Sequence, residues 1–126
     1  MTLTLTLTLT LMRDFRNYDI WIDAMELVNE IYDLVEQFPE KERYILSSQV
    51  IRAAVSIPSN IAEGAAKSSP KDFSRFLGIA LGSAFELETQ ILIAIRRNYI
   101  DKSGFDLNKL HSLQKRLQGF RNHLKK

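Results

Sequence analysis

Two stretches of the sequence place polar side chains at helical spacing within segments that are otherwise apolar. The only charged side chain in residues 44–62 is Arg52, and the only ones in residues 76–95 are Glu86 and Glu88. A polar side chain that lies in the core has to find a hydrogen-bond partner there. We therefore expect a polar network, in the core or at an interface, that consists of Gln49, Arg52, Ser56, Asn60, Glu63, Ser83, Glu86, Glu88 and Gln90.

This polar network is predicted to be structural rather than catalytic. Catalysis would need a nucleophile or a general base in a cleft, and no His, Cys or Lys joins the network. Two helices that fold back about a turn at Lys67 would place Arg52 near Gly82 and within reach of Glu86. A buried pair of these charges would fix the register of the two helices, because a mispaired buried charge is costly.

The residue types that support metal or thiol chemistry are missing or wrongly spaced. The chain has no cysteine, which excludes disulfides, thiolate catalysis and cysteine-ligated zinc. A di-iron carboxylate bundle needs Glu-x-x-His pairs on two inward-facing helices, and the sequence contains none. His111 and His123 have no carboxylate near them in sequence, so we expect both to be solvated or part of the basic face. The sequence predicts no enzyme activity, no catalytic residue, no metal site, no cofactor and no small-molecule substrate.

Charge is distributed unevenly along the chain, although the net charge is only +2. Residues 17–40 carry seven acids and no Lys or Arg, whereas residues 107–126 carry six bases and no acid. The basic segment is either a solvated face that attracts the acidic first helix or a surface that neutralises nucleic-acid phosphates. Phe120 apart, no aromatic side chain alternates with these bases as in single-strand stacking surfaces. The candidate nucleic-acid-binding residues are Lys109, Lys115, Arg116, Arg121, Lys125 and Lys126.

Hydrophobic periodicity predicts four helices in one domain that covers residues 13–126. Pro39 is expected to end the first helix and Pro58 to bend the second, while Ser69 and Asp106 are expected to cap the third and fourth. Short loops between such helices make successive helices antiparallel. The predicted fold class is all-α, an antiparallel up-down four-helix bundle with helices over residues 19–37, 40–65, 70–98 and about 107–124.

The N-terminal residues and the hydropathy of the chain bear on the cellular compartment of the protein. Residues 1–12 contain alternating Thr and Leu, a strand periodicity with no second strand-like stretch to pair with, so we expect a disordered extension. No apolar run reaches the roughly 18 residues that span a bilayer, and no segment has the pattern of a cleaved signal peptide. We therefore expect a cytoplasmic protein that does not contact a membrane.

The second predicted helix has too few polar residues to provide the solvent-facing side that a helix keeps in a lone bundle. Its candidates for that side are Ser47, Ser48, Arg52 and Ser59. Another subunit would have to cover the rest of this side, with Ile51 or Val55 facing it. The sequence therefore predicts a homo-oligomer.

The second and third predicted helices also carry a dense set of residues that resembles a family signature. The set consists of Leu46, Gln49, Arg52, Ala53, Ser56-Ile57, Asn60-Ile61-Ala62-Glu63-Gly64, Phe73, Phe76, Leu77, Ala80, Gly82-Ser83, Glu86-Leu87-Glu88 and Gln90. The resemblance extends from about Phe15, through Trp21, to about Leu117. These residues resemble those of a small bacterial family of four-helix-bundle proteins, which are encoded in intervening sequences of large-subunit ribosomal RNA genes. The family also includes accessory proteins of diversity-generating retroelements.

This resemblance implies a homopentamer that forms a barrel with a central channel. It also implies RNA, DNA or a nucleoprotein such as a reverse transcriptase as the partner. Two functions stay open from the sequence. The protein is either a non-enzymatic oligomeric scaffold that presents a basic surface to such a partner, or a structural or selfish-element protein that only self-associates without binding nucleic acid.

Overall fold

A computed structural model describes residues 13–125 of the chain, and these residues form helices and the turns that join them. The Thr-Leu repeat and Lys126 lie outside this described part. Within it the fold is all-α, as predicted, with no strand. The long helices are α2 (Asp19–Val35), α3 (Leu46–Ala65), α4 (Pro70–Arg96) and α5 (Leu107–Leu124), and the 3-10 helices are η1 (Phe15–Asn17), η2 (Glu40–Glu42) and η3 (Lys102–Gly104).

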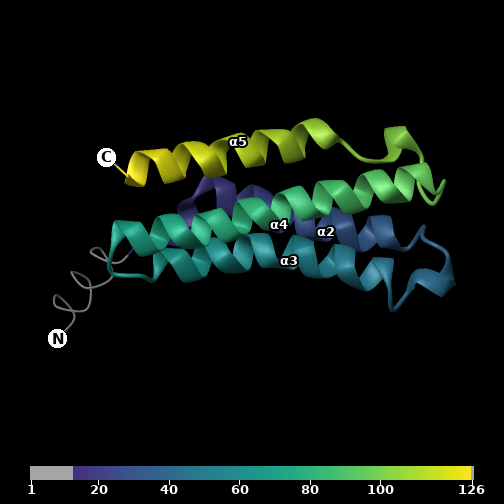
Figure 1. Cartoon of the computed structure of the whole chain (residues 1–126), viewed down its shortest axis with the longest axis horizontal. Coiled ribbons are helices and arrows are strands. Elements are labelled where there is room, and N and C mark those ends of the chain that lie inside the picture. The colour runs from purple at the N-terminus through teal and green to yellow at the C-terminus, as the bar shows by residue number, and fades with distance from the viewer. Residues whose placement is uncertain (1–12, 126) are drawn as a thin grey trace.

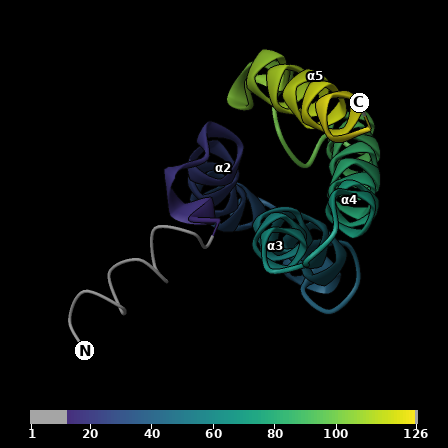
Figure 2. The ribbon, with the colours of Figure 1, turned by 90° about the vertical axis from the view of Figure 1, so that its left-hand side faces the viewer.

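The four long helices lie lengthwise along the molecule, and each is joined to the next by a short connection (Figure 1). Each of the successive pairs α2 with α3, α3 with α4, and α4 with α5 packs extensively. By contrast, α2 and α5 touch at few residues, and in the end-on view an opening separates their ribbons (Figure 2). The helices therefore follow one another around the core, and α2 and α5 are its two outer members.

The core contains the apolar faces that the periodicity predicts. On α2 the buried side chains recur at steps of three or four residues, and the same is true of α5. Trp21, Val28 and Val35 are partly buried and pack against this core. The buried residues of the two outer helices are Ile20, Ala24, Leu27, Ile31 and Leu34 on α2, and Leu110, Leu113 and Leu117 on α5.

The second predicted helix starts later than the sequence indicated. Glu40–Glu42 forms a separate 3-10 turn, and Ile45 leaves the helical region at φ −117° and ψ −95°, so α3 begins only at Leu46. The Tyr99 hydroxyl donates a hydrogen bond to a Glu42 carboxylate oxygen over 2.7 Å. This bond ties the 3-10 turn to the segment that follows α4, which a helical continuation of α3 would not allow.

The predicted helix signals on α3 and α4 are present. Ser69 caps α4 by accepting a hydrogen bond from the Asp72 N–H over 3.1 Å. Pro58 lies inside α3, and the nearby Asn60 amide donates to the carbonyl of Ser56 at 2.8 Å. At its other end α4 stops two residues before the predicted limit, because Asn98 adopts the left-handed conformation at φ 62° that commonly terminates helices.

One helix meets the length and composition criteria for a membrane span, which the sequence analysis did not anticipate. This helix is α4, and a third of its most apolar window is buried, 33%. The core helix of a soluble protein meets the same criteria, and α4 packs on both α3 and α5. The packing of α4 on α3 and α5 therefore explains part of its apolar composition. The rest lies on the exposed side of the helix, at Ile79, Phe85, Leu92 and Ile93.

Gly64 lies where α3 and α4 are packed closely together. A Cβ atom added at this position would lie 2.7 Å from the Cβ of Phe76 and 3.3 Å from the carbonyl oxygen of Phe73. Both atoms belong to rigid parts of α4, so the helices would have to move apart to make room. The α3–α4 contact therefore depends on the missing side chain at Gly64.

We predict that Gly64→Ala lowers the free energy of unfolding by about 1–3 kcal/mol, the usual range for overpacking a tight core. Thermal and urea denaturation followed by circular dichroism would measure the change. Gly119→Ala is the matched control, because a Cβ there meets nothing within 4 Å, and alanine is favoured over glycine within a helix. A Gly64→Ala protein as stable as the parent would show that the two helices are not in tight contact at this point.

Candidate nucleic-acid interface

Three of the candidate bases on α5 are already bound within the chain. Lys109 pairs with Glu30 of α2 at 3.4 Å, and Arg116 pairs with Asp23 of α2 at 2.7 Å. The predicted attraction between the acidic first helix and the basic last helix therefore takes the form of two ion pairs. Arg121 points to the other neighbour, where its Nε donates to the carbonyl of Ser74 on α4 over 3.0 Å.

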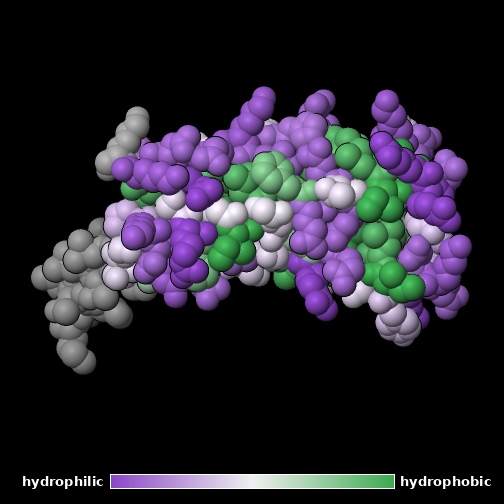
Figure 3. All heavy atoms as spheres, viewed as in Figure 1, coloured by the Kyte–Doolittle hydropathy of each residue, from purple (hydrophilic) through white to green (hydrophobic). Residues whose placement is uncertain are grey.

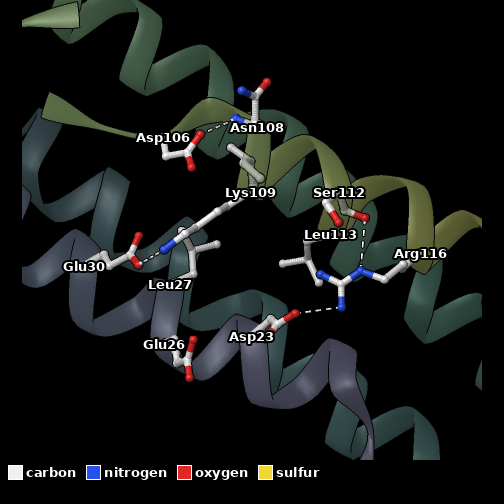
Figure 4. Close-up of a pocket in the computed structure, with 11 residues that line it drawn as sticks. Asp23, Glu26, Leu27, Glu30, Asp106, Asn108, Lys109, Ser112, Leu113 and Arg116 are labelled. Atoms are coloured by element: carbon white, nitrogen blue, oxygen red, sulfur yellow. Dashed lines mark hydrogen bonds and ion pairs between the residues drawn. The ribbon is translucent and has the colours of Figure 1, made fainter. Parts of the chain in front are cut away.

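The two ion pairs cross a groove of about 380 Å³ between α2 and α5. Figure 4 shows Lys109 and Arg116 reaching from α5 across this groove, toward Glu30 and Asp23 of α2 respectively. The side chains in both pairs are substantially exposed to solvent, so each pair contributes little stability, at most about 1 kcal/mol. The groove is lined by Asp23, Glu26, Leu27, Glu30, Asp106, Asn108, Lys109, Leu110, Ser112, Leu113 and Arg116.

The bases left over on α5 are Lys115 and Lys125, since Lys126 lies outside the described residues. Both are exposed, and neither forms an ion pair with any residue of the 13–125 segment. The structure adds Lys71 and Arg75 of α4, which the sequence analysis did not include among the candidates. They line a second groove of about 530 Å³ between α4 and α5 together with Asp72, Ser74, Arg121, Leu124 and Lys125.

An aromatic cluster at the start of α2 adjoins the basic end of α5. The ring centroids of Tyr18 and Phe120 are 5.4 Å apart in an edge-to-face arrangement, and Phe73 of α4 lies within 5.2 Å of Phe120. Burial raises the pKa of the Tyr18 hydroxyl, although the charge of Arg13 opposes this shift. The sequence analysis found only Phe120 near the bases, because Tyr18 is about a hundred residues away along the chain and reaches α5 only through the fold.

Glu88 belongs to a polar cluster between α4 and α5. Its carboxylate accepts a hydrogen bond from the Gln114 side-chain amide over 2.8 Å and lies 3.2 Å from Nε2 of His111. The Gln114 bond holds the pKa of Glu88 below its usual value, and His111 adds to this, whereas partial burial opposes it. His111 therefore has a carboxylate beside it in the fold, although none is near it in sequence, and it is partly exposed, while His123 is exposed.

The predicted network on α3 lies at the surface of the chain rather than in its core. Within residues 13–125, Arg52 and Glu86 form no ion pair, and both are exposed. The expected buried pair is therefore absent from the single chain. The reason is that the apolar side of α3 is wide enough to face both α2 and α4, and this leaves the polar side outward. Gln49 and Glu63 are exposed as well, and Gln90 donates to Glu86 within α4 at 3.1 Å.

Part of this network does form, on the outer side of α3 and α4. The hydroxyls of Ser56 and Ser83 are hydrogen-bonded at 2.8 Å, and the Asn60 amide donates to the Ser56 hydroxyl at 2.9 Å. Figure 3 shows hydrophobic residues in patches among polar ones on the side where α3 and α4 face the viewer. The exposed large apolar residues of these two helices are Val55, Ile79, Phe85, Leu92 and Ile93.

No group of three or more His, Cys, Asp and Glu side chains that could hold a metal ion occurs among the described residues. The chemistry that the surfaces offer is therefore ionic, hydrogen-bonding and apolar contact.

The chain is similar to a known protein family and to a solved structure. Residues 16–119 match the family described as 23S rRNA-intervening sequence protein. The chain belongs to this family. None of the curated proteins compared matches it.

A solved structure supports the membership of the 23S rRNA-intervening sequence protein family. It is a protein of unknown function from the S23 ribosomal protein family of Bacteroides thetaiotaomicron, with 26% identity and a TM-score of 0.61. The match covers 83% of this chain and 94% of that protein. The similarity therefore extends over nearly the whole helical domain.

We predict that Glu88→Gln lowers the free energy of unfolding at pH 7 by about 1 kcal/mol, because the amide loses the charge-assisted bonds to α5. The folded-state pKa of Glu88 is lowered, so the stabilisation is present above the unfolded-state pKa and is lost as the pH falls through the folded-state pKa. Urea denaturation over a series of acidic pH values should show parent and variant converging. The control is Glu26→Gln, at an exposed carboxylate of α2 that forms no ion pair within residues 13–125, and an equal loss in both variants would contradict the role of the cluster.

Proposed function

We propose that the protein is a non-enzymatic, cytoplasmic scaffold that self-associates through the outer side of α3 and α4. In this proposal the four helices form an antiparallel up-down bundle, and the bundle is the protomer of a homo-oligomer. The observation that carries the proposal is the set of large apolar side chains on α3 and α4, with Val55 38% and Phe85 53% exposed. Apolar side chains gathered in patches on one side of a small domain commonly mark an association surface.

The polar residues on this surface support self-association. Ser56, Asn60 and Ser83 already hydrogen-bond to one another across α3 and α4. Arg52 and Glu86 are exposed beside the apolar residues, where they are free to pair with residues of another subunit. An interface of apolar residues with a few directed polar contacts has the composition of known protein interfaces. The family resemblance further supports a pentamer as the assembly.

The second part of the proposal is that the assembly presents a basic surface to RNA, DNA or a nucleoprotein such as a reverse transcriptase. Lys71, Arg75 and Lys125 support it, because they are exposed and line one groove between the start of α4 and the end of α5. Lys115 adds an exposed base on the side of α5 that faces α2. In a cyclic oligomer this surface is repeated in every subunit, so weak contacts add to one extended positive field. The alternative function is self-association without nucleic-acid binding, as in a structural or selfish-element protein.

We predict that the parent protein has a mass several times the 14.5 kDa of the single chain in light scattering. Val55→Glu combined with Phe85→Glu should give the monomer mass without loss of helicity, because two buried charges would be unpaired at the interface. Val55 is chosen over Ile51, which is partly buried and packs on the core of its own chain. Tyr32→Glu, at an exposed aromatic position of α2, is the matched control, and a parent that is monomeric at micromolar concentration would overturn the proposal.

We predict that the parent shifts RNA and DNA in gels at about 50 mM salt and much more weakly at about 200 mM, as phosphate contacts require. Lys115→Glu combined with Lys125→Glu should abolish the shift while leaving the oligomer unchanged. The control carries the same charge reversal at Lys41 and Lys102, which are exposed at the opposite end of the molecule. Equal binding by both double variants would show that Lys115 and Lys125 do not form the binding surface, and no shift by the parent would leave self-association alone as the function.

A further inference from the structure

We propose that the pocket between the start of α2 and the end of α5 binds one nucleobase of a single-stranded nucleic acid. In this proposal the phosphates of the strand contact the Lys and Arg side chains on either side of α5. This inference rests on the nucleic-acid binding proposed above and assigns it a form of nucleic acid, a site and a mode of contact.

The pocket has the size and the walls that a stacked base requires. Its volume is about 720 Å³, and Tyr18 and Phe120 are the aromatic residues among those lining it. Both rings are partly exposed, while Phe73 behind them is almost fully buried and holds them in place through ring contacts of 6.2 Å with Tyr18 and 5.2 Å with Phe120. Rings fixed in this way lose little conformational freedom when a ligand stacks on them.

Gly119 keeps the α5 side of the pocket open. It precedes Phe120 and lines the pocket, and a Cβ atom at this position would have no neighbour within 4 Å. The space over Gly119 is therefore open to a ligand on the side of α5 that lines the pocket.

The charges around the pocket favour an anionic strand. Lys115, Arg116 and His123 line it, against a single acid, Asp19. Arg116 is held by Asp23, so Lys115 is the free cation nearest the aromatic pair in the pocket, and His123 is an exposed donor. A phosphate attached to the stacked base would find these donors at the rim of the pocket.

The other side of the same end of α5 is also positive. The groove between α4 and α5 is lined by Lys71, Arg75, Arg121 and Lys125, against the single acid Asp72. Ser74 lines this groove, and its hydroxyl is buried without a hydrogen-bond partner among the described residues. Because Phe120 and Arg121 are adjacent on α5, a strand whose base occupies the aromatic pocket would lead its neighbouring phosphates toward this groove.

Single strands fit this arrangement better than duplexes. The faces of bases in a duplex are covered by their neighbours, so an aromatic pocket gains contact only with an unstacked base. Stacking on an aromatic ring is tolerant of base identity, since every base has a π-face. We therefore expect binding of single-stranded RNA and DNA with little sequence preference.

Fluorescence anisotropy with the full chain tests the inference. The probes are a labelled oligouridylate of about 12 nucleotides, the same backbone with abasic sites, and a duplex of equal length. The parent should bind the oligouridylate about tenfold more tightly than the abasic strand, which has the same phosphates. Phe120→Leu should remove this preference and leave abasic binding unchanged, because leucine preserves apolar packing without a ring to stack on. Tyr32→Leu, at an exposed aromatic outside the pocket, should change neither.

The binding results distinguish a failure of the stacking pocket from a failure of the proposed nucleic-acid binding. Equal binding of oligouridylate and abasic strand by the parent, or a preference for the duplex, would overturn the stacking pocket while leaving nucleic-acid binding intact. No binding of any probe by the parent would overturn the proposed nucleic-acid function itself. Displacement of the strand by uridine monophosphate at equal nucleotide concentration would assign the pocket to a free nucleotide instead. A melting curve would detect a folding defect in Phe120→Leu. In that case Tyr18→Leu, which removes the other ring of the pocket, tests the stacking instead.

Discussion

The fold depends on the burial of α4 between two neighbours. Phe73, Leu77, Ala84, Leu87 and Ile91 are almost completely buried, and their spacing places them along the side of α4 that contacts α3 and α5. A helix with two neighbours needs a wide apolar side, which accounts for part of the apolar composition of α4, and the exposed apolar residues of its outer side account for the rest. Alanine and glycine at the contacts, above all Gly64, allow the helix backbones to come close, so much of the remaining architecture follows from how tightly α3 and α4 meet.

The two outer helices are joined in a different way. Between α2 and α5 direct contacts are few, and solvent-exposed ion pairs take the place of an apolar seam. These pairs compete with any external ligand for the same side chains. Lys109 and Arg116 are therefore occupied by contacts within the fold. The bases available to a partner are Lys115, Lys125 and those of α4, which do not pair with α2.

The sequence predicts those features that depend on neighbours along the chain. The presence and order of the four helices, the caps at Ser69 and Asp106 and the buried faces of α2 and α5 are predicted correctly, because periodicity and capping are local properties. The outward orientation of Arg52 could not be predicted, since two apolar lines on one helix do not say which of its sides meets a neighbour. The same limit applies to the late start of α3, where the Tyr99 bond to Glu42 joins residues 57 positions apart. The pairing of His111 with Glu88 and of Tyr18 with Phe120 is likewise tertiary, so the candidate site was only partly visible.

The chain-like order of the helices has a consequence for how the molecule opens. Because α2 packs mainly on α3, and α5 mainly on α4, either outer helix can detach without separating α3 from α4. Each outer helix would then have its own free energy of opening, which is lower than the free energy of global unfolding. Backbone amides of α2 and α5 would then exchange with solvent deuterium ahead of those in the central pair. A ligand that bridges the start of α2 and the end of α5 would slow the amide exchange of both outer helices together. Binding at one end of the molecule would therefore reduce local opening along the whole length of these helices.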